Sequence, residues 1–408
     1  MRFLNYIVGC ISKRATTKKH VLVKREIVIR DNNCTTIDLS SLHLFEDHIS
    51  RITPSKPSTL FFSNNYQHLQ MGNVSGRKSS KSMDNPEIKS ARIKLNDGRY
   101  LAYRESGVSK EVANFKIIIV HGFGSNKDMS FLAPQEVIKE LKIYMVLYDR
   151  AGYGESDPNP KRTPKSEALD IEQLADQLQL GSKFYVIGVS MGSYPTWSCL
   201  HYIPHRLQGV ALMAAVVNYR WPSLPKRLTK DDFRKGLVKL ALWILKRAPG
   251  LLYWWMTQKM FPSTNIMEKN PVFFNERDVE VLKRTPGFEL LSENKFEQRS
   301  VFDNLRQDFM VGFGKWEFNP LKLNNPFLKN DGSVHLFVGF EDKVVPVELQ
   351  RYVMGELPWI KYHEIPHGGH LIVYDEDVCE SVLRSLLLDE ELAPKPLPKQ
   401  KQLNETDL

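Results

Sequence analysis

A serine between two glycines stands directly after an apolar run of this chain. The pentad Gly188-Val189-Ser190-Met191-Gly192 follows residues 183–187, whose apolar side chains predict a buried strand. A tight turn from that strand into a helix would hold Ser190 strained and exposed, and a side chain at either glycine would clash with the neighbouring strand and helix. This geometry suits a nucleophilic hydroxyl. Short Gly/Ser patterns also recur by chance, so the interpretation depends on a base, an acid and backbone donors elsewhere in the chain.

A histidine after the last expected strand is the candidate base. A serine hydroxyl is a poor nucleophile near neutral pH, and an imidazole can both take its proton and return it. His370 follows a pair of glycines, beyond the strand predicted over residues 360–365. His367 is the alternative. We therefore expect His370 to activate Ser190 as a general base.

The candidate acid lies in the loop after a strand predicted over residues 334–338. Asp342 occupies the acidic place of a G-x-x-D-x-x-V-P pattern. Loops at the carboxyl ends of strands are where ligands bind in open sheets of alternating strands and helices. A buried carboxylate there would fix the imidazole tautomer and stabilise the imidazolium. Glu341 is the alternative.

Backbone N–H groups must also be aimed at the oxygen on which negative charge develops. Met191, directly after the serine, is expected to supply one of them. The second is expected from the loop after the strand predicted over residues 116–120, which reads His121-Gly122-Phe123-Gly124. We assign that donor to Phe123, with Gly124 as the alternative.

His363, His367 and His370 superficially resemble a set of metal ligands. Pro366 and the glycine pair between them exclude a helix that would align the three imidazoles. We expect no metal ion here, and no other motif implies a cofactor.

The elements that must position these residues alternate from about residue 90 onward. Short strands are predicted over residues 91–95, 100–105, 116–120, 143–148, 184–188, 209–214, 334–338 and 360–365. Helical patterns cover residues 134–141, 166–178, 191–202 and 378–388. Strands that are apolar throughout and alternate with helices predict an α/β fold whose mostly parallel central sheet has helices on both faces.

The alternation stops in a long stretch that is helical and rich in Trp, Phe and Lys. Its most apolar part, residues 237–256, is interrupted by charges, Pro and Gly, which predicts two short amphipathic helices and no membrane span. The predicted organisation is an N-terminal extension that is largely disordered or targeting (1–90), a first part of the core (91–216), a helical lid insertion (217–328), a second part of the core (329–392) and a polar tail (393–408).

Together these motifs resemble the α/β-hydrolase superfamily, of the fold-1 type, over roughly residues 90–390. Besides the pentad, the resemblance rests on residues 121–124, on residues 149–156, on the Asp342 loop and on Gly369-His370. It implies a triad of Ser190, Asp342 and His370, because the partners follow in that order in this superfamily. Residues 149–156 lack a phosphate-loop pattern and are interpreted as a tight structural turn.

One further segment carries a narrower resemblance. Residues 253–262 are similar to a lid segment of a plant subgroup that is largely uncharacterised. Members of that subgroup often begin with an apolar anchor, whereas this chain shows no clear span at its N-terminus.

Charge and cysteine usage bound the partners and the compartment. The net charge of +9 is uneven, since residues 1–90 hold 14 Lys and Arg against 7 Asp and Glu. No folded module shows a basic face with interleaved aromatics, so we expect no nucleic-acid partner. The four cysteines are far apart, which favours a reducing compartment such as the cytoplasm. The apolar and basic residues 1–19 leave organellar targeting and membrane association as alternatives.

The leading hypothesis is a serine hydrolase, a carboxylesterase or lipase-like enzyme that forms an acyl-enzyme on Ser190. The apolar, aromatic lid suggests a hydrophobic or lipid-like ester, with Trp254 and Trp255 in the pocket and with membrane contact through the lid or the N-terminal extension. The alternatives are a ligand receptor on the same fold with little turnover, and a C–C bond hydrolase or acyltransferase that uses the same triad. The oligomeric state is left open.

Overall fold

The computed structural model describes residues 26–29, 35–38, 91–257, 274–284, 298–328 and 331–390. The chain divides into two compact units, Met1–Asp84 and Asn85–Leu408. In the first unit, β1 (Glu26–Ile29) pairs antiparallel with β2 (Thr35–Asp38). The expectations of a disordered or targeting extension and of a polar tail fall mainly outside the described residues.

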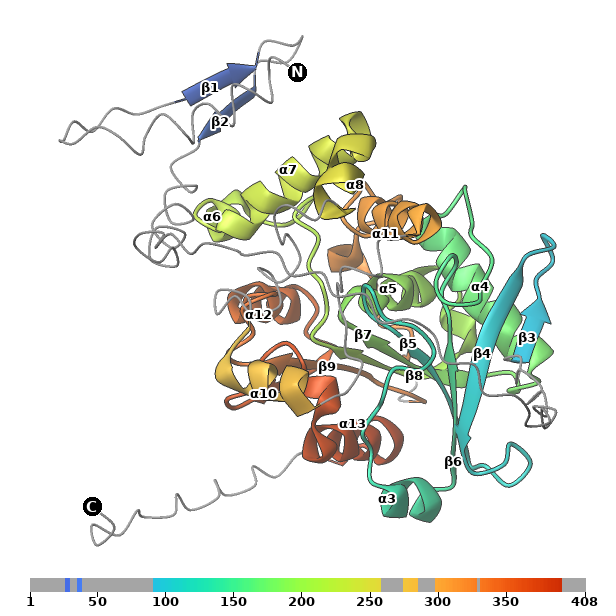
Figure 1. Ribbon diagram of the computed structural model, residues 1–408. Coiled ribbons are helices and arrows are strands. Elements are labelled where there is room, and N and C mark those ends of the chain that lie inside the picture. The colour runs from blue at the N-terminus through green and yellow to red at the C-terminus, as the bar shows by residue number, and fades with distance from the viewer. Residues whose placement is uncertain are drawn as a thin grey trace, which may run out of the picture. The chain divides into compact units, whose positions relative to one another are not determined.

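An eight-stranded sheet forms the centre of the second unit, in the order β10-β9-β8-β7-β5-β6-β4-β3 (Figure 1). Neighbours from β10 to β6 run parallel, whereas β4 and β3 are antiparallel to their neighbours. The predicted mostly parallel sheet is therefore confirmed. Its strands are β3 (Ala91–Lys94), β4 (Tyr100–Gly107), β5 (Phe115–Val120), β6 (Ile143–Tyr148), β7 (Phe184–Val189), β8 (Leu207–Met213), β9 (Val334–Gly339) and β10 (Lys361–Ile365).

Helices cover both faces of this sheet, as the continuous apolar strands predict. On one face lie α4 (Pro164–Gln177), α5 (Ser193–Tyr202) and α12 (Val347–Glu356), and on the other lie α3 (Gln135–Glu140) and α13 (Glu376–Leu388) (Figure 1). Successive strand residues point to opposite faces, so Ile118 packs in one apolar core and Ile119 in the other. Both side chains are fully buried.

Local sequence explains where two of these helices begin. Thr163 caps α4 by accepting a hydrogen bond from Ser166 N, and Ser166 Oγ returns a contact to the backbone of Thr163. Pro164 suits the first helical position, where no N–H is needed. The side chain of Asp375 caps α13 in the same way, by accepting from Val378 N.

The segment between β8 and β9 contains the helices that the sequence assigns to the insertion, and we call residues 217–328 the inserted segment. Its apolar part forms two helices, as predicted, which meet at Ala248. In Figure 1, α7, α8 and α11 lie close together, whereas α10 lies near β9 and α13. The helices are α6 (Lys226–Thr229), α7 (Phe233–Arg247), α8 (Pro249–Thr257), α10 (Glu276–Arg284) and α11 (Arg299–Gly312). Short 3₁₀ turns are η2 (Ser190–Gly192), η3 (Pro204–Arg206), η5 (Pro320–Lys322) and η6 (Ile372–Tyr374).

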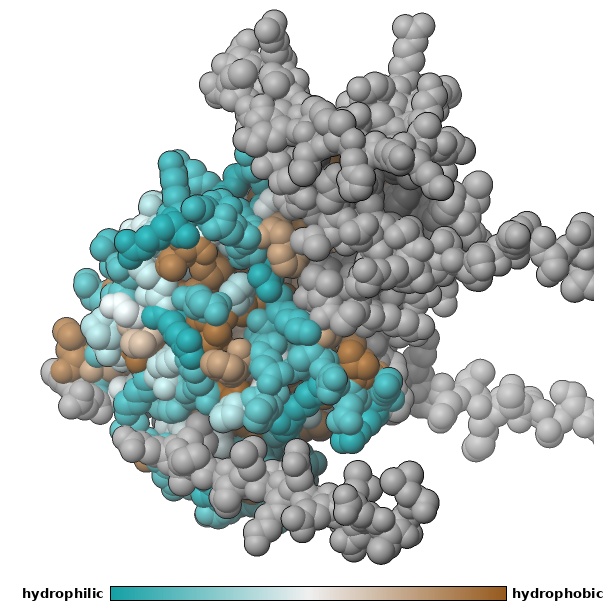
Figure 2. Space-filling model, turned by 90° about the vertical axis from the view of Figure 1, so that its left-hand side faces the viewer, coloured by the Kyte–Doolittle hydropathy of each residue, from teal (hydrophilic) through white to brown (hydrophobic). Residues whose placement is uncertain are grey.

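The side of the molecule drawn in Figure 2 has a mostly hydrophilic described surface, with hydrophobic residues in separate areas. This is the distribution expected when the strands bury most of the apolar side chains. Among the described residues, no helix combines the length and the apolarity needed to cross a bilayer.

Candidate active site

Ser190 sits at the sharp turn between β7 and α5. Its φ of 51° lies in the left-handed region, which residues other than glycine rarely adopt. A Cβ on Gly188 would lie 2.2 Å from Thr196 Oγ1 of α5, and a Cβ on Gly192 would lie 2.1 Å from the carbonyl oxygen of Val120 in β5. The two glycines are therefore required by the close approach of the helix and of the neighbouring strand.

The structure brings Ser190, His370 and Asp342 into one line of hydrogen bonds. Ser190 Oγ lies 2.8 Å from His370 Nε2, and His370 Nδ1 lies 2.8 Å from Asp342 Oδ2. The other carboxylate oxygen of Asp342 accepts hydrogen bonds from the N–H groups of Val344 and Val345, at 2.8 and 2.9 Å. Three strands, β7, β9 and β10, end at this edge of the sheet and place the three side chains together.

The partners of His370 decide which ring nitrogen carries the proton. An ionised Asp342 can only accept, so Nδ1 donates to it and Nε2 presents its lone pair to the hydroxyl of Ser190. Burial by itself lowers the pKa of His370. The charge of Asp342, its hydrogen bond and the charge of Asp278 outweigh that effect and leave the pKa above its ordinary value. The arrangement suits a base that takes a proton from Ser190.

The two alternatives from the sequence lie elsewhere and pair with each other. His367 Nδ1 is 3.0 Å from Glu341 Oε1, and these side chains are 66% and 43% exposed. His363 Nε2 instead contacts His335 Nδ1 at 3.0 Å. The three histidines of the C-terminal segment thus have three separate sets of partners, and the described residues contain no cluster of three or more side chains arranged for a metal ion.

The loop expected to supply a backbone donor lies against the serine. A Cβ on Gly122 would lie 3.3 Å from Ser190 Cβ, so the backbone of residues 121–124 closely approaches Ser190. Phe123 packs its ring edge-on to Phe309 of α11, and Gly124 has a φ of 71°. Met191 is buried in η2 directly after the serine. Gly122, directly before Phe123, and Met191, directly after Ser190, therefore both lie next to the serine.

His121 links this loop to Arg150, which follows β6. The N–H of Arg150 donates to His121 Nε2 at 3.1 Å, and His121 Nδ1 lies 2.8 Å from the carbonyl oxygen of Gly122. Because an N–H group can only donate, Nε2 must be unprotonated and Nδ1 must carry the hydrogen. Burial and the charge of Arg150 hold the pKa of His121 well below its ordinary value, so the ring stays neutral.

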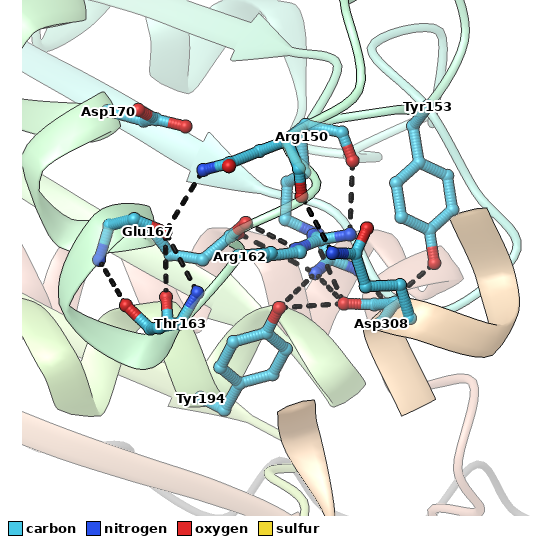
Figure 3. A network of polar contacts seen from close by, with 12 residues as sticks. Arg150, Tyr153, Arg162, Thr163, Glu167, Asp170, Tyr194 and Asp308 are labelled. Atoms are coloured by element: carbon cyan, nitrogen blue, oxygen red, sulfur yellow. Dashed lines mark hydrogen bonds and ion pairs between the residues drawn. The ribbon is translucent and has the colours of Figure 1, made fainter. Parts of the chain in front are cut away.

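A buried ionic network joins the same loop to the inserted segment (Figure 3). Asp308 of α11 binds the guanidinium of Arg150 through both oxygens, at 2.7 and 2.8 Å, and lies 3.1 Å from Arg162. The hydroxyls of Tyr153 and Tyr194 donate to the same carboxylate at 2.6 and 2.7 Å. These contacts hold the pKa of Asp308 below its ordinary value despite its complete burial.

The network reaches the loop near the serine at both His121 and Gly122, since the ring of Tyr153 packs edge-on against His121. Arg150 Nη2 donates to the carbonyl oxygen of Gly122 at 3.3 Å. Arg162 donates to Glu167 Oε1 at 2.5 Å, so two buried cations face two buried carboxylates. The run from residue 149 to 156 is therefore a structural turn, as the sequence predicts, and Arg150 gives it a link to the site.

Two acids of the inserted segment contact the site without having been singled out from the sequence. They are Asp308 of α11 and Asp278 of α10. The carboxylate of Asp278 accepts hydrogen bonds from the backbone of the loop that carries His370. Each lies in an amphipathic helix with other acids, and nothing local distinguishes it.

The two tryptophans expected in the substrate pocket stay a prediction. Trp254 is 51% exposed, and the side chain of Trp255 lies outside the described residues. The resemblance of residues 253–262 to a plant subgroup stays a prediction.

Comparison with known proteins bears on the family and the fold. A model of the alpha/beta hydrolase family matches residues 117–382. Lipase 1 of Psychrobacter immobilis is 34% identical over 109 residues, which are 26% of this chain and 32% of that protein. The chain thus matches about a third of the length of this relative.

Solved structures resemble the chain over most of their length at low sequence identity. MGS-M2, an alpha/beta hydrolase enzyme from a Medee basin deep-sea metagenome library, has a TM-score of 0.52 and 16% identity, with 75% of this chain and 100% of that chain covered. An alpha/beta hydrolase fold protein from Chitinophaga pinensis has a TM-score of 0.50 and 15% identity, with coverages of 74% and 98%. Because the family model covers more than half of the sequence and these structures share the fold, the chain belongs to the alpha/beta hydrolase family.

Proposed function

We propose that this protein is a serine hydrolase that cleaves carboxylic esters, with Ser190 as nucleophile, His370 as base and Asp342 as the acid that orients His370. The observation that carries the proposal is the unbroken line of hydrogen bonds from Ser190 through His370 to Asp342 at the carboxyl edge of the sheet. The strained backbone at Ser190 supports it, because such strain is found where a side chain must be presented for chemistry.

In the proposed reaction Ser190 Oγ attacks the ester carbonyl carbon while its proton passes to His370 Nε2. The amides of Met191 and Phe123 hold the oxyanion of the tetrahedral intermediate. The intermediate collapses when the carbon–oxygen bond to the alcohol breaks and His370 gives its proton to that oxygen. A water molecule then repeats the sequence on the acyl-enzyme, with His370 again taking the proton, and releases the acid.

A hydrophobic ester is the substrate class that we propose, and the outer face of α7 and α8 supports it. Large apolar side chains are 41–51% exposed there, namely Leu237, Leu240, Trp243, Leu251 and Trp254. Neither helix contains an acidic residue, and α7 ends on Lys246 and Arg247. An apolar face with Trp and basic residues fits the interface of an anionic lipid layer, where a lipid-like ester is dissolved.

A fluorophosphonate probe tests the proposed nucleophile on the full-length protein. The probe forms a bond to an activated serine, so the wild type is expected to be labelled. Ser190→Ala is expected to lose the label, and its rate of ester hydrolysis is expected to fall by roughly 10⁴-fold or more. Ser198→Ala is the matched control, because Ser198 lies on α5, the helix that follows Ser190, and its hydroxyl donates to the carbonyl oxygen of Tyr194.

Two outcomes would overturn the proposal. Folded wild-type protein that takes no label would favour a ligand receptor with little turnover. Labelling that persists in Ser190→Ala would place the reactive serine elsewhere.

A further inference from the structure

We propose that Asp278, from α10 of the inserted segment, is a positioning residue that holds His370 in register with Ser190. The proposal rests on the proposed function, since it assigns Asp278 a part in the same reaction. Asp278 does not touch the reacting atoms. It acts through the backbone of the loop that carries His370.

Both carboxylate oxygens of Asp278 bind adjacent N–H groups of that loop. Oδ2 accepts from His370 N at 2.9 Å, and Oδ1 accepts from Leu371 N at 2.8 Å. Asp278 is only 2% exposed, so these charge-assisted hydrogen bonds form away from competing water. Two bonds to neighbouring residues fix both the position and the direction of the backbone from which the imidazole projects.

Gly369 is the residue that lets the carboxylate approach so closely. A Cβ at this position would lie between 2.2 and 2.3 Å from the three carboxylate atoms of Asp278. Real Cβ atoms do not approach neighbours to this distance, so a side chain here would displace Asp278 or the loop. The glycine before His370 thus has a steric requirement that comes from the inserted segment.

Asn275 ties the start of α10 to both loops of the site. Its Oδ1 accepts from Asp278 N at 2.8 Å, and Asn275 N lies 3.3 Å from Asp278 Oδ2, which is the reciprocal pattern of a helix capping box. Its amide nitrogen contacts Glu341 Oε2 at 3.3 Å and the carbonyl oxygen of His367 at 3.4 Å. The orientation of Asp278 is therefore set by the same helix start that touches the acid loop and the histidine loop.

The charge of Asp278 also acts on the base itself. It is one of the influences that raise the pKa of His370, after the charge and the hydrogen bond of Asp342. Replacing the carboxylate by an amide removes that charge and turns one acceptor into an NH₂ group that faces a backbone N–H. We therefore expect two separable effects, a lower pKa of His370 and a less well placed imidazole.

The experiment compares wild-type full-length protein with Asp278→Asn, Asp278→Glu and the control Glu280→Gln. Glu280 lies on the same helix in an exposed pair with Arg284. We expect Asp278→Asn to lower kcat roughly 10- to 100-fold with little change in KM, because a misplaced catalytic group costs rate at constant binding. Asp278→Glu keeps the charge but not the geometry, so its His370 should titrate as in the wild type while kcat still falls. Glu280→Gln should match the wild type.

The titration of the His370 ring, followed by NMR and assigned with His370→Gln, separates this proposal from the proposed function. Its midpoint should be lower in Asp278→Asn even if the protein turns over no ester, in which case only the proposed function fails. Wild-type kcat and an unchanged midpoint in Asp278→Asn would overturn the proposal. If Asp278→Asn does not fold, wild-type kcat in Asp278→Glu would overturn it instead.

Discussion

His370 receives two opposing influences, and the balance between them sets the pH range in which it can serve as a base. Burial favours the neutral ring, while the two nearby carboxylates favour the charged ring, and the carboxylates prevail. A base must be neutral to accept a proton from Ser190. Activity is therefore lost as the pH falls through the pKa of His370, which lies above the ordinary value of 6.5.

We expect kcat/KM of the wild type for a neutral ester to fall on the acid side with a midpoint above pH 6.5, measured over a buffer series at constant ionic strength.

Asp342→Asn should lower kcat by about 10⁴-fold, because the ring of His370 then loses both its fixed tautomer and its stabilising charge. Glu341→Gln is the control, and it should change kcat less than about 3-fold since Glu341 pairs with an exposed histidine. Equal losses in both variants would contradict the assignment of Asp342.

The sequence predicts which residues lie at the strand ends but not everything that touches them. Ser190 and Asp342 each follow an apolar strand, and His370 follows a predicted strand and a pair of glycines, so local signals place all three. Asp278 and Asp308 find their partners 92 and 158 residues away in the chain. No local pattern reports a contact of that kind, because it depends on how the inserted segment packs against the sheet.

At the scale of elements, α11 joins the inserted segment to the sheet through charge as well as through apolar contact. Its Phe302 and Leu305 pack in a small core with Tyr153 and with Leu245 of α7. Beside that core, Asp308 pairs with two buried arginines, Arg150 just after β6 and Arg162 just before α4. The sequence predicts a helical stretch over residues 217–328 and two short helices within residues 237–256, but it gives neither the bounds of α11 nor its pairing with Arg150.

We expect Asp308→Asn to lower the free energy of unfolding by about 3–5 kcal/mol, because it leaves two buried guanidinium groups without their shared carboxylate. Denaturant unfolding followed by circular dichroism measures the change. Asp303→Asn on the same helix is the control, since Asp303 forms an exposed pair with Arg299 and should cost less than about 1 kcal/mol. Similar losses in the two variants would show that the buried network contributes no special stability.

At the scale of the whole molecule, the residues proposed for chemistry all belong to one of the two compact units. The sheet, the candidate triad and the exposed face of α7 and α8 lie within Asn85–Leu408. Most of the excess positive charge instead belongs to residues 1–90. The two parts can therefore be tested separately for catalysis and for lipid binding.

We expect residues 85–408 alone to hydrolyse esters with kcat/KM within about 3-fold of the full chain and to bind vesicles that contain phosphatidylserine, as measured by co-sedimentation. Leu240→Glu combined with Trp243→Glu should abolish binding, whereas Val112→Glu, at an exposed apolar position far from α7 in the sequence, should not. Binding should weaken as salt increases. Vesicle binding that disappears on truncation would assign lipid contact to the first unit.

The two acids that the inserted segment sends toward the sheet have a consequence for protein engineering. A chimera that receives this segment from another hydrolase would acquire a different substrate pocket, but it would also lose Asp278 beside Gly369 and Asp308 between its arginines. Such grafts should work only when the donor segment carries a carboxylate at the place of Asp278 and either has one at the place of Asp308 or is combined with replacement of Arg150 and Arg162. Compatibility at these positions, rather than the length of the transplanted segment, is then the criterion by which donors should be chosen.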